Sequence, residues 1–568
     1  MKNALAILAA PLVLFTASCG DQSDPSAAQP PAANYADLVI HGGPIYTGAS
    51  DGVVEAVAVK DSRISAVGAY GGLESMIGGD TRVIDLGGAA MYPGFTDSHA
   101  HLFAIGRREM ILNLEGVSSV EELVDIVAAS AVDSAPGETI SGLGWIETGW
   151  PENRFPNRDD LDAVTPDNPV VLTRADGHAL VANSAALDAA GIDDDTPNPD
   201  GGRIERDANG RATGILIDAA MQLVASLIET PSPQTIKDAY RLAGEVYAGY
   251  GWTGMHNMSV EPGHVAVMEE MSNRGEMNIR VYNALNPDGL SMLEQGGPRA
   301  NLNTRVVTRA VKLFADGALG SRGAALFEPY TDEPDTDGLL LMNHDEARAL
   351  MDRAVLAGAQ ICTHAIGDRG NRLALDWYEE TFGANSDAGD LRWRIEHAQI
   401  LDAADIPRFA QLDVIPSMQP SHAIGDLFFA PARLGPDRLA GAYAWRSLID
   451  AGSIIAGGSD APVERGDPLI EFYAAVARRG LDGTQTPQWR PEEAVTRDEA
   501  LKMFTVWPAY ASFQENQLGT IEVGKQADFT AFSKDIMSVA ESEILNAEPV
   551  LTIVAGDIIF EGDTAQSN

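Results

Sequence analysis

The chain has 568 residues, with 82 Asp and Glu against 39 Lys and Arg, which gives a formal net charge of −43. This acidity argues against a nucleic-acid partner and against a polybasic membrane binder, because such partners repel a polyanion. Two cysteines exclude a disulfide scaffold and a zinc finger built on four thiolates. A chain of this length with 45% hydrophobic residues can bury a large core.

The first residues have the pattern of an export signal. Lys2 precedes an apolar run that is too short to span a membrane, and small residues precede Cys19. We predict a signal peptide over residues 1–18. Its end resembles the lipobox of bacterial lipoproteins, which implies lipidation of Cys19, although Thr16 departs from that pattern and a plain signal peptide is the alternative. Residues 19–34 are rich in Ser, Pro and Ala and are predicted to form a disordered tether. The expected location is the bacterial periplasm or the outer membrane, with the lipid anchor as the only membrane contact.

Short β-rich runs separated by glycine-containing turns occupy both ends of the chain after this leader. They cover residues 35–90 and 515–563. Because the two ends have the same texture and enclose a long α/β middle, we predict that they combine into one small β-sandwich domain.

Residues 91–514 alternate short buried strands with helical patterns. We predict eight strands, at residues 92–101, 252–257, 278–285, 309–316, 360–367, 394–399, 414–419 and 453–460. Eight such strands with helices between them predict the α/β class and a (β/α)8 TIM-like barrel. The first interval is too long for one crossover helix, so residues 102–238 are predicted to hold an insertion, a loop-rich cap over the barrel mouth.

Polar side chains occupy corresponding positions in five of the predicted strands. His99 and His101 lie two residues apart on the first strand and therefore face the same way. The others, on four further strands, are Lys312, His364, His397 and Asp460. In a barrel the carboxyl ends of all strands meet at one mouth. Four imidazoles, a carboxylate and a lysine at that mouth predict a divalent-metal site of the kind that suits zinc, manganese or cobalt.

Eight ordered motifs resemble the amidohydrolase superfamily, and within it the YtcJ-like group (amidohydrolase family 3), which includes N-substituted formamide deformylases. The motifs are Pro93–His101, Asp176–His178, Gly201–Ile204, Val311–Ala318, His364–Asp368, Glu396–Gln399, Gly458–Pro462 and Leu518–Asp528. The resemblance implies a metal-dependent hydrolase barrel flanked by a β-sandwich from both chain ends. It also implies hydrolysis of a C–N bond in a small amide-like substrate.

The resemblance also implies a role for each strand-end residue. His99, His101 and Asp460 would hold a first metal ion. His364 and His397 would hold a second. Asp460 would also be the catalytic residue, as general base toward a metal-activated hydroxide that attacks the carbonyl and then as acid toward the leaving amine. One or two divalent ions are expected, with zinc as the first choice.

Lys312 matches the position at which many relatives carry a carboxylated lysine that bridges both ions. An ammonium group beside two dications would be repelled and desolvated, so the neutral amine is favoured there. Reaction with CO₂ would turn that amine into an anionic bidentate ligand. If Lys312 is unmodified, a single-metal site is the alternative.

Four more residues are candidates for substrate binding: His178, Arg322, Gln419 and His422. The family pattern places His178, in the insertion, against the substrate or the developing oxyanion. Arg322 follows the fourth strand and could pair with an anionic substrate group. Gln419 ends the seventh strand, and His422 follows it. His256 and Asp97 are expected to support the ligands from behind.

Other functions remain open at this point. The same metal site could act on an ester or a cyclic amide, or deaminate a heterocycle. A non-catalytic solute-binding lipoprotein would share the signal and the tether, but it has no need of five strand ends with metal ligands, and its two-lobed hinge pattern is absent. No nucleic-acid partner is expected, and a homodimer is left open.

Overall fold

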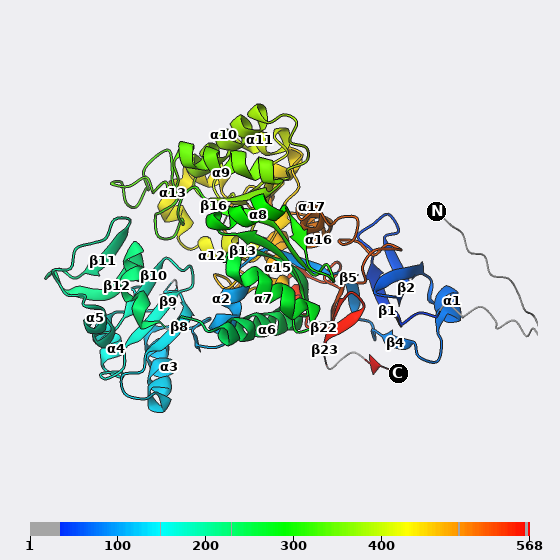
Figure 1. The fold of residues 1–568 in the computed structure, drawn as a ribbon, viewed down its shortest axis with the longest axis horizontal. Coiled ribbons are helices and arrows are strands. Elements are labelled where there is room, and N and C mark those ends of the chain that lie inside the picture. The colour runs from blue at the N-terminus through cyan, green and yellow to red at the C-terminus, as the bar shows by residue number, and fades with distance from the viewer. Residues whose placement is uncertain (1–34, 148, 229, 487–488, 563–565, 568) are drawn as a thin grey trace, which may run out of the picture.

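The computed structural model describes residues 35–147, 149–228, 230–486, 489–562 and 566–567. The predicted signal peptide, the tether and Cys19 lie outside the described residues. Figure 1 shows a central barrel, a β-rich insertion on one side, and on the other side a sheet that holds strands from both chain ends. Within the described ranges, no helix is long and apolar enough to cross a membrane.

Eight parallel strands form the barrel, each within or overlapping a predicted strand, and this confirms the predicted (β/α)8 class. They are β6 (Phe95–Ala100), β13 (Trp252–Val260), β14 (Arg280–Leu285), β16 (Val306–Phe314), β17 (Gln360–Ala365), β18 (Arg394–His397), β19 (Ile415–Met418) and β20 (Ala456–Gly457), with β15 (Arg299–Ala300) beside β16. The ring closes after β20 through two backbone hydrogen bonds. The His101 amide donates to the Ala461 carbonyl (2.8 Å), and the Asp460 amide donates to the His99 carbonyl (2.6 Å). Closure therefore fixes Asp460 beside the two histidines of the first strand.

Helices alternate with the barrel strands (Figure 1). They are α2 (Leu102–Arg108), α6 (Pro233–Tyr250), α7 (Pro262–Asn273), α8 (Leu290–Gly296), α9 (His344–Ala357), α10 (Asp368–Ala384), α11 (Ile406–Gln411), α12 (Pro420–Asp426), α13 (Ala430–Arg438), α14 (Trp445–Asp450), α15 (Pro468–Ala477), α16 (Arg497–Met503) and α17 (Val506–Ala511). Helix α6 has clear sequence limits. Ser232 caps it by accepting a hydrogen bond from the Thr235 amide (3.1 Å), and Pro233 occupies its first turn. Gly251 ends it in the left-handed conformation (φ 104°).

The insertion differs from the predicted loop-rich cap because it contains a six-stranded sheet, in the order β11-β12-β10-β9-β8-β7. The strands are β7 (Leu112–Asn113), β8 (Ile140–Trp145), β9 (Val170–Arg174), β10 (Ala179–Ala182), β11 (Gly202–Arg206) and β12 (Ala212–Asp218), and the helices are α3 (Val120–Asp133), α4 (Arg158–Asp162) and α5 (Ser184–Ala190). Two separate apolar clusters stabilise it, one around Trp145 and Leu172 and the other around Leu180 and Leu216. The insertion thus has its own hydrophobic core.

Strands from both chain ends share one nine-stranded sheet, in which β21 pairs antiparallel with β5. The members are β1 (Leu38–Tyr46), β2 (Val53–Lys60), β3 (Arg63–Gly68), β4 (Arg82–Asp85), β5 (Ala90–Pro93), β21 (Phe529–Phe532), β22 (Pro549–Val554), β23 (Asp557–Glu561) and β24 (Gln566–Ser567), with the short helices α1 (Tyr70–Leu73) and α18 (Glu541–Ile544) nearby in the chain. A buried ion pair between Arg280 and Asp528 (2.9 Å) ties β14 of the barrel to this sheet.

Candidate active site at the mouth of the barrel

A cavity of about 460 Å³ opens where the barrel strands end. Six side chains from five strand ends line it, and they are the predicted metal-site residues His99, His101, Lys312, His364, His397 and Asp460. All are buried except His101, whose side chain is 28% exposed. The structure therefore brings the six predicted side chains to one place.

His99, His397 and Asp460 form the tightest group. One candidate ligand atom from each lies within 4.8 Å of the others. The Asp460 Oδ1 atom is 3.4 Å from Nε2 of His99 and 3.2 Å from Nε2 of His101. The Nζ atom of Lys312 lies 3.4 Å from the same His99 nitrogen. Nitrogen and oxygen donors thus converge on a small buried volume.

His364 lies beside this group. Its ring centroid is 4.5 Å from that of His397. Its Nε2 atom is 3.7 Å from a carboxylate oxygen of Asp316 and 3.5 Å from the Gly317 carbonyl oxygen. Asp316 is held in turn by three backbone amides, among them that of Gly367 (2.8 Å). His364 therefore borders the group on the side of β16 and β17.

Burial keeps the central side chains in the form that binds a cation. The pKa of His99 is lowered to about 4 by burial and by the neighbouring Lys312. Burial also lowers the pKa of His364 and of His397 well below the usual value, and it lowers the pKa of Lys312. A neutral imidazole offers the lone pair that a metal ion needs.

A buried carboxylate orients the His99 ring from the side opposite the cavity. Nδ1 of His99 donates to Glu396 Oε2 at 2.6 Å, so Nε2 is the nitrogen that faces the cavity. Arg394 forms an ion pair with Glu396 (2.8 Å) and donates to Nδ1 of His256 (2.8 Å). Burial raises the pKa of Glu396, but Arg394 and His99 outweigh it and hold that pKa below its usual range. The sequence prediction missed Glu396 and Arg394, although two charges at i and i+2 in a buried strand are a usable signal.

Backbone turns at the strand ends direct the other ligands. Glu396 and His397 are neighbours and would face opposite sides of a regular strand. His397 has φ 74° and Asp460 has φ 63°, and such turns at strand ends are typical of functional sites. Nδ1 of His397 donates to Oε1 of Gln419 at 2.9 Å. Gln419 therefore holds His397 and is absent from the described cavity wall, which differs from its predicted contact with substrate.

Asp97 supports the same region through the backbone. It is fully buried and accepts hydrogen bonds from the His99 amide (3.0 Å), from Ser459 Oγ (2.5 Å) and from the Tyr247 hydroxyl (3.0 Å). Burial raises its pKa to about 6. Asp97 thus joins the first barrel strand to the segment that carries Asp460.

The insertion supplies one wall of the cavity, including His178. His178 lies between β9 and β10 and bonds through Nδ1 to Asp218 at the end of β12 (2.8 Å). Burial lowers its pKa, but Asp218 and Asp176 outweigh that effect and raise it. His422 also lines the cavity, with Nε2 3.6 Å from an Asp460 oxygen.

Arg322 is not part of the described lining of this cavity. Its guanidinium forms an ion pair with Asp332 (2.9 Å). Asp332 also pairs with Arg433, and the predicted contact of Arg322 with an anionic substrate group stays a prediction.

Comparison with known proteins agrees with this geometry. The model of the amidohydrolase family matches residues 82–560. The chain belongs to the amidohydrolase family. It is 34% identical over 532 residues to YtcJ of Bacillus subtilis (strain 168), covering 92% of this chain and 99% of that protein. It is 28% identical over 530 residues to the N-substituted formamide deformylase of Arthrobacter pascens, covering 90% and 96% of the two chains. An uncharacterized metal-dependent hydrolase from Pyrococcus horikoshii OT3 has a similar structure, with a TM-score of 0.73, 27% identity and coverage of 89% of this chain and 99% of that one.

In this amidohydrolase the cavity has two chemically distinct sides. The barrel side presents neutral imidazoles and the Asp460 carboxylate. The insertion side presents His178 together with Arg174 and Asp176. Such a site can bind a divalent cation on one side and contact the polar part of a bound molecule on the other.

Proposed function

We propose that this amidohydrolase uses divalent metal bound at His99, His101, His364, His397 and Asp460 to hydrolyse amide-type C–N bonds. The observation that carries the proposal is the buried His99, His397 and Asp460 group at the end of the barrel strands. Water would add to the carbonyl carbon, the C–N bond would break, and a carboxylic acid and an amine would leave.

The donor atoms fit a divalent ion. Within the part of the chain that the structure describes, Oδ1 of Asp460 and Nε2 of His422 are buried without a hydrogen-bond partner. Unpaired buried polar atoms are costly, and a bound cation would satisfy the carboxylate oxygen. A mixed imidazole and carboxylate set suits zinc, which we propose as the ion.

A bound divalent ion would supply a lowered pKa for water and polarisation of the substrate carbonyl. The residues of this chain supply the proton transfers and the positioning. Asp460 accepts a proton from the attacking water through its free oxygen and returns it to the leaving nitrogen. His178, whose raised pKa favours the protonated ring, donates a hydrogen bond toward negative charge that develops on the substrate.

We also propose that Lys312 is carboxylated in the active enzyme. Its side chain is 1% exposed, and its Nζ lies 3.4 Å from Nε2 of His99. Burial lowers its pKa, which favours the neutral amine that reacts with CO₂. Intact mass spectra recorded with and without bicarbonate test this modification.

Hydrolysis of a panel of N-substituted formamides and N-acyl amino acids by the metal-loaded chain tests the function. One relative is named as an N-substituted formamide deformylase, which makes formamides the first choice. We expect stoichiometric release of the amine. Activity on esters alone, on cyclic amides alone or only on an amino-heterocycle would contradict the proposal.

We further propose export with a lipid anchor at Cys19, on the basis of Lys2, the apolar run and the small residues that follow it. Wild type should fractionate with membranes and Cys19→Ser should not. Equal fractionation would contradict the anchor.

A further inference from the structure

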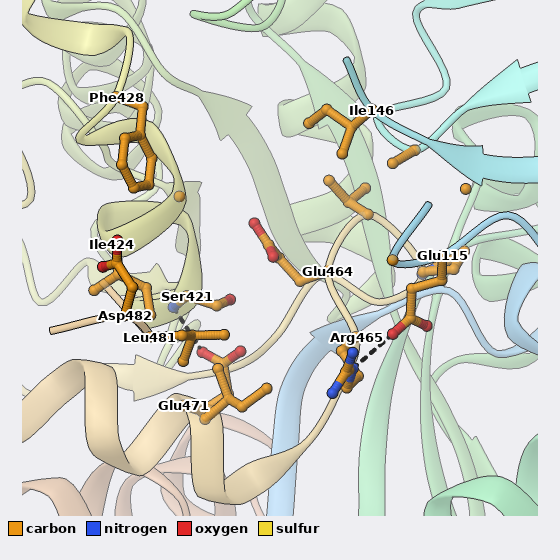
Figure 2. A pocket seen from close by; sticks show the side chains of 18 residues that line it. Glu115, Ile146, Ser421, Ile424, Phe428, Glu464, Arg465, Glu471, Leu481 and Asp482 are labelled. Carbon is orange, nitrogen blue, oxygen red and sulfur yellow. Dashed lines mark hydrogen bonds and ion pairs between the residues drawn. The ribbon is translucent and has the colours of Figure 1, made fainter. Parts of the chain in front are cut away.

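A second cavity of about 410 Å³, whose lining Figure 2 shows, borders the active-site cavity. The two cavities share five lining residues, Ile146, Gly425, Phe428, Val463 and Glu464. They are therefore neighbouring chambers, and Glu464 lies between them because it lines both.

Most of the second chamber has apolar walls. They come from the insertion, from α12, from α15 and from the loops beside them, and they include Ile146, Ile424, Phe428, Val463, Ile470 and Leu481. Phe428 is 57% exposed and Leu481 is 54% exposed. Large apolar side chains that remain exposed around a cavity are typical of a ligand site, because a bound apolar group would remove them from water.

Two carboxyl groups in this chamber have unused hydrogen-bonding capacity. Glu471 is fully buried, and its Oε2 accepts a hydrogen bond from the Ser421 amide (3.0 Å), as Figure 2 shows. Among the described residues, its Oε1 and the Ser421 hydroxyl have no partner. Glu464 has no hydrogen-bond donor or basic partner among the described residues, and its charged neighbours are other carboxylates.

The chamber also has an excess of acidic groups. Four acidic residues line it, namely Glu115, Glu464, Glu471 and Asp482. Arg465 is the one basic residue among the described lining residues, and its guanidinium is already paired with Glu115 at 2.7 Å. Hydrogen bonds from Thr484 lower the pKa of Asp482, so this rim residue is charged at neutral pH. Among the described lining residues, Glu464, Glu471 and Asp482 thus have no basic partner, and a ligand with a positive charge would meet no unpaired cation.

Burial raises the pKa of Glu471, and burial with nearby carboxylates raises that of Glu464 to about 8. Both groups are therefore disfavoured as bare anions. A ligand that brings a positive charge and N–H donors would compensate both.

We propose that this second chamber is a substrate subsite for an apolar arm that ends in an amino group. The ammonium N–H groups would donate to Oε1 of Glu471 and to Glu464, and the carbon chain would contact Ile424 and Ile470. The preferred substrates would then be amides with one amine-bearing alkyl or aryl substituent, an assignment that rests on the proposed function for the bond that is cleaved.

Direct binding tests the chamber without any reaction. Calorimetry on the zinc-loaded full chain would compare n-hexylamine, n-hexanol and n-hexanoate. We expect hexylamine to bind about tenfold more tightly than hexanol, because hydrogen bonds to charged groups are the stronger ones, and hexanoate to bind most weakly. Equal affinities for the amine and the alcohol, or tighter binding of hexanoate, would overturn the proposal.

Two variants locate the binding. Glu471→Gln keeps the shape and should weaken hexylamine about tenfold. Leu481→Trp fills the chamber from its exposed rim and should abolish binding, whereas the matched control Leu356→Trp, on an 86%-exposed residue of α9 outside both cavities, should not. If neither chamber variant changes hexylamine binding, the amine binds elsewhere and the proposal is wrong.

Hydrolysis separates this proposal from the proposed function. We expect kcat/KM for mono-N-formyl-1,6-diaminohexane to exceed that for N-formylhexylamine and for N-methylformamide, and Glu471→Gln to remove this preference. Hydrolysis of all three without a preference contradicts the subsite and leaves the proposed function intact. The expected amine binding without hydrolysis of any formamide or N-acyl amino acid contradicts the proposed function and supports the subsite.

Discussion

The barrel side and the insertion side of the cavity are built differently. On the barrel side, His99 and Glu396 are completely buried, and each belongs to a strand whose neighbours are fixed by the closed sheet. On the insertion side, the His178 ring is 31% exposed and comes from a connection between two strands of a separate sheet. We therefore propose that the reaction chemistry resides in the barrel, whereas substrate contact resides in an element with its own core.

The largest effect is expected for a substitution on the barrel side of the cavity, at Asp460. Asp460→Asn removes the proton acceptor but keeps the side-chain shape, so kcat should fall about a thousandfold. Circular dichroism and thermal unfolding should be nearly unchanged, which separates lost chemistry from lost structure. Retention of more than a tenth of the activity would show that Asp460 is not the base.

The next largest effect is expected at Glu396, which orients the His99 ring. Glu396→Gln leaves Arg394 buried without a full counter-charge, and we expect a loss of about 3 kcal/mol in the free energy of unfolding. It also weakens the orientation of His99, so metal affinity should fall about 10- to 100-fold. Denaturant unfolding and zinc titration measure the two effects. Glu379→Gln is the matched control and should change neither, because the Glu379 side chain is 60% exposed and its partner Arg408 keeps its ion pairs with Asp376 and Asp405.

A smaller effect is expected on the insertion side. His178→Ala should raise KM or lower kcat/KM about tenfold, because one hydrogen bond to the substrate is lost, while metal content stays at the wild-type level. Steady-state kinetics with elemental analysis provides both readouts. A loss of metal in this variant would show that His178 also supports the metal site, which contradicts the separation of metal binding on the barrel side from substrate contact on the insertion side.

The smallest effect is a pH dependence. Asp218 raises the pKa of folded His178 above 6.5 despite the opposing effect of burial. The pair of protonated His178 with Asp218 therefore stabilises the folded state. Its contribution to the free energy of unfolding is fully present below the unfolded pKa of about 6.5 and is lost as pH rises through the folded pKa. An NMR titration should place the midpoint above 6.5 in wild type and lower in Asp218→Asn. Equal midpoints would show that the two side chains are uncoupled.

The barrel and its ligands could be predicted because both have local signals. Short buried strands ending in polar residues revealed all eight strands, and the i, i+2 spacing of His99 and His101 gave a shared direction. Closure of the barrel then placed Asp460 beside them, although nearly 360 residues separate them in the chain.

The remaining features depend on contacts that one sequence does not encode locally. The strands of the insertion are short and interrupted by Trp, Pro and Gly, so its sheet has no clear local signal. The ion pair of Arg322 with Asp332 depends on the path of the connection that carries Asp332. The bond between His397 and Gln419 depends on the turn at His397, which cannot be read from residue types.

We propose that this amidohydrolase holds a catalytic divalent ion at the barrel strand ends. Anomalous diffraction from zinc-loaded crystals would locate the ion. We expect an anomalous peak within bonding distance of His99, His397 and Asp460. A well-occupied zinc site at another position, with no peak between these three side chains, would contradict it.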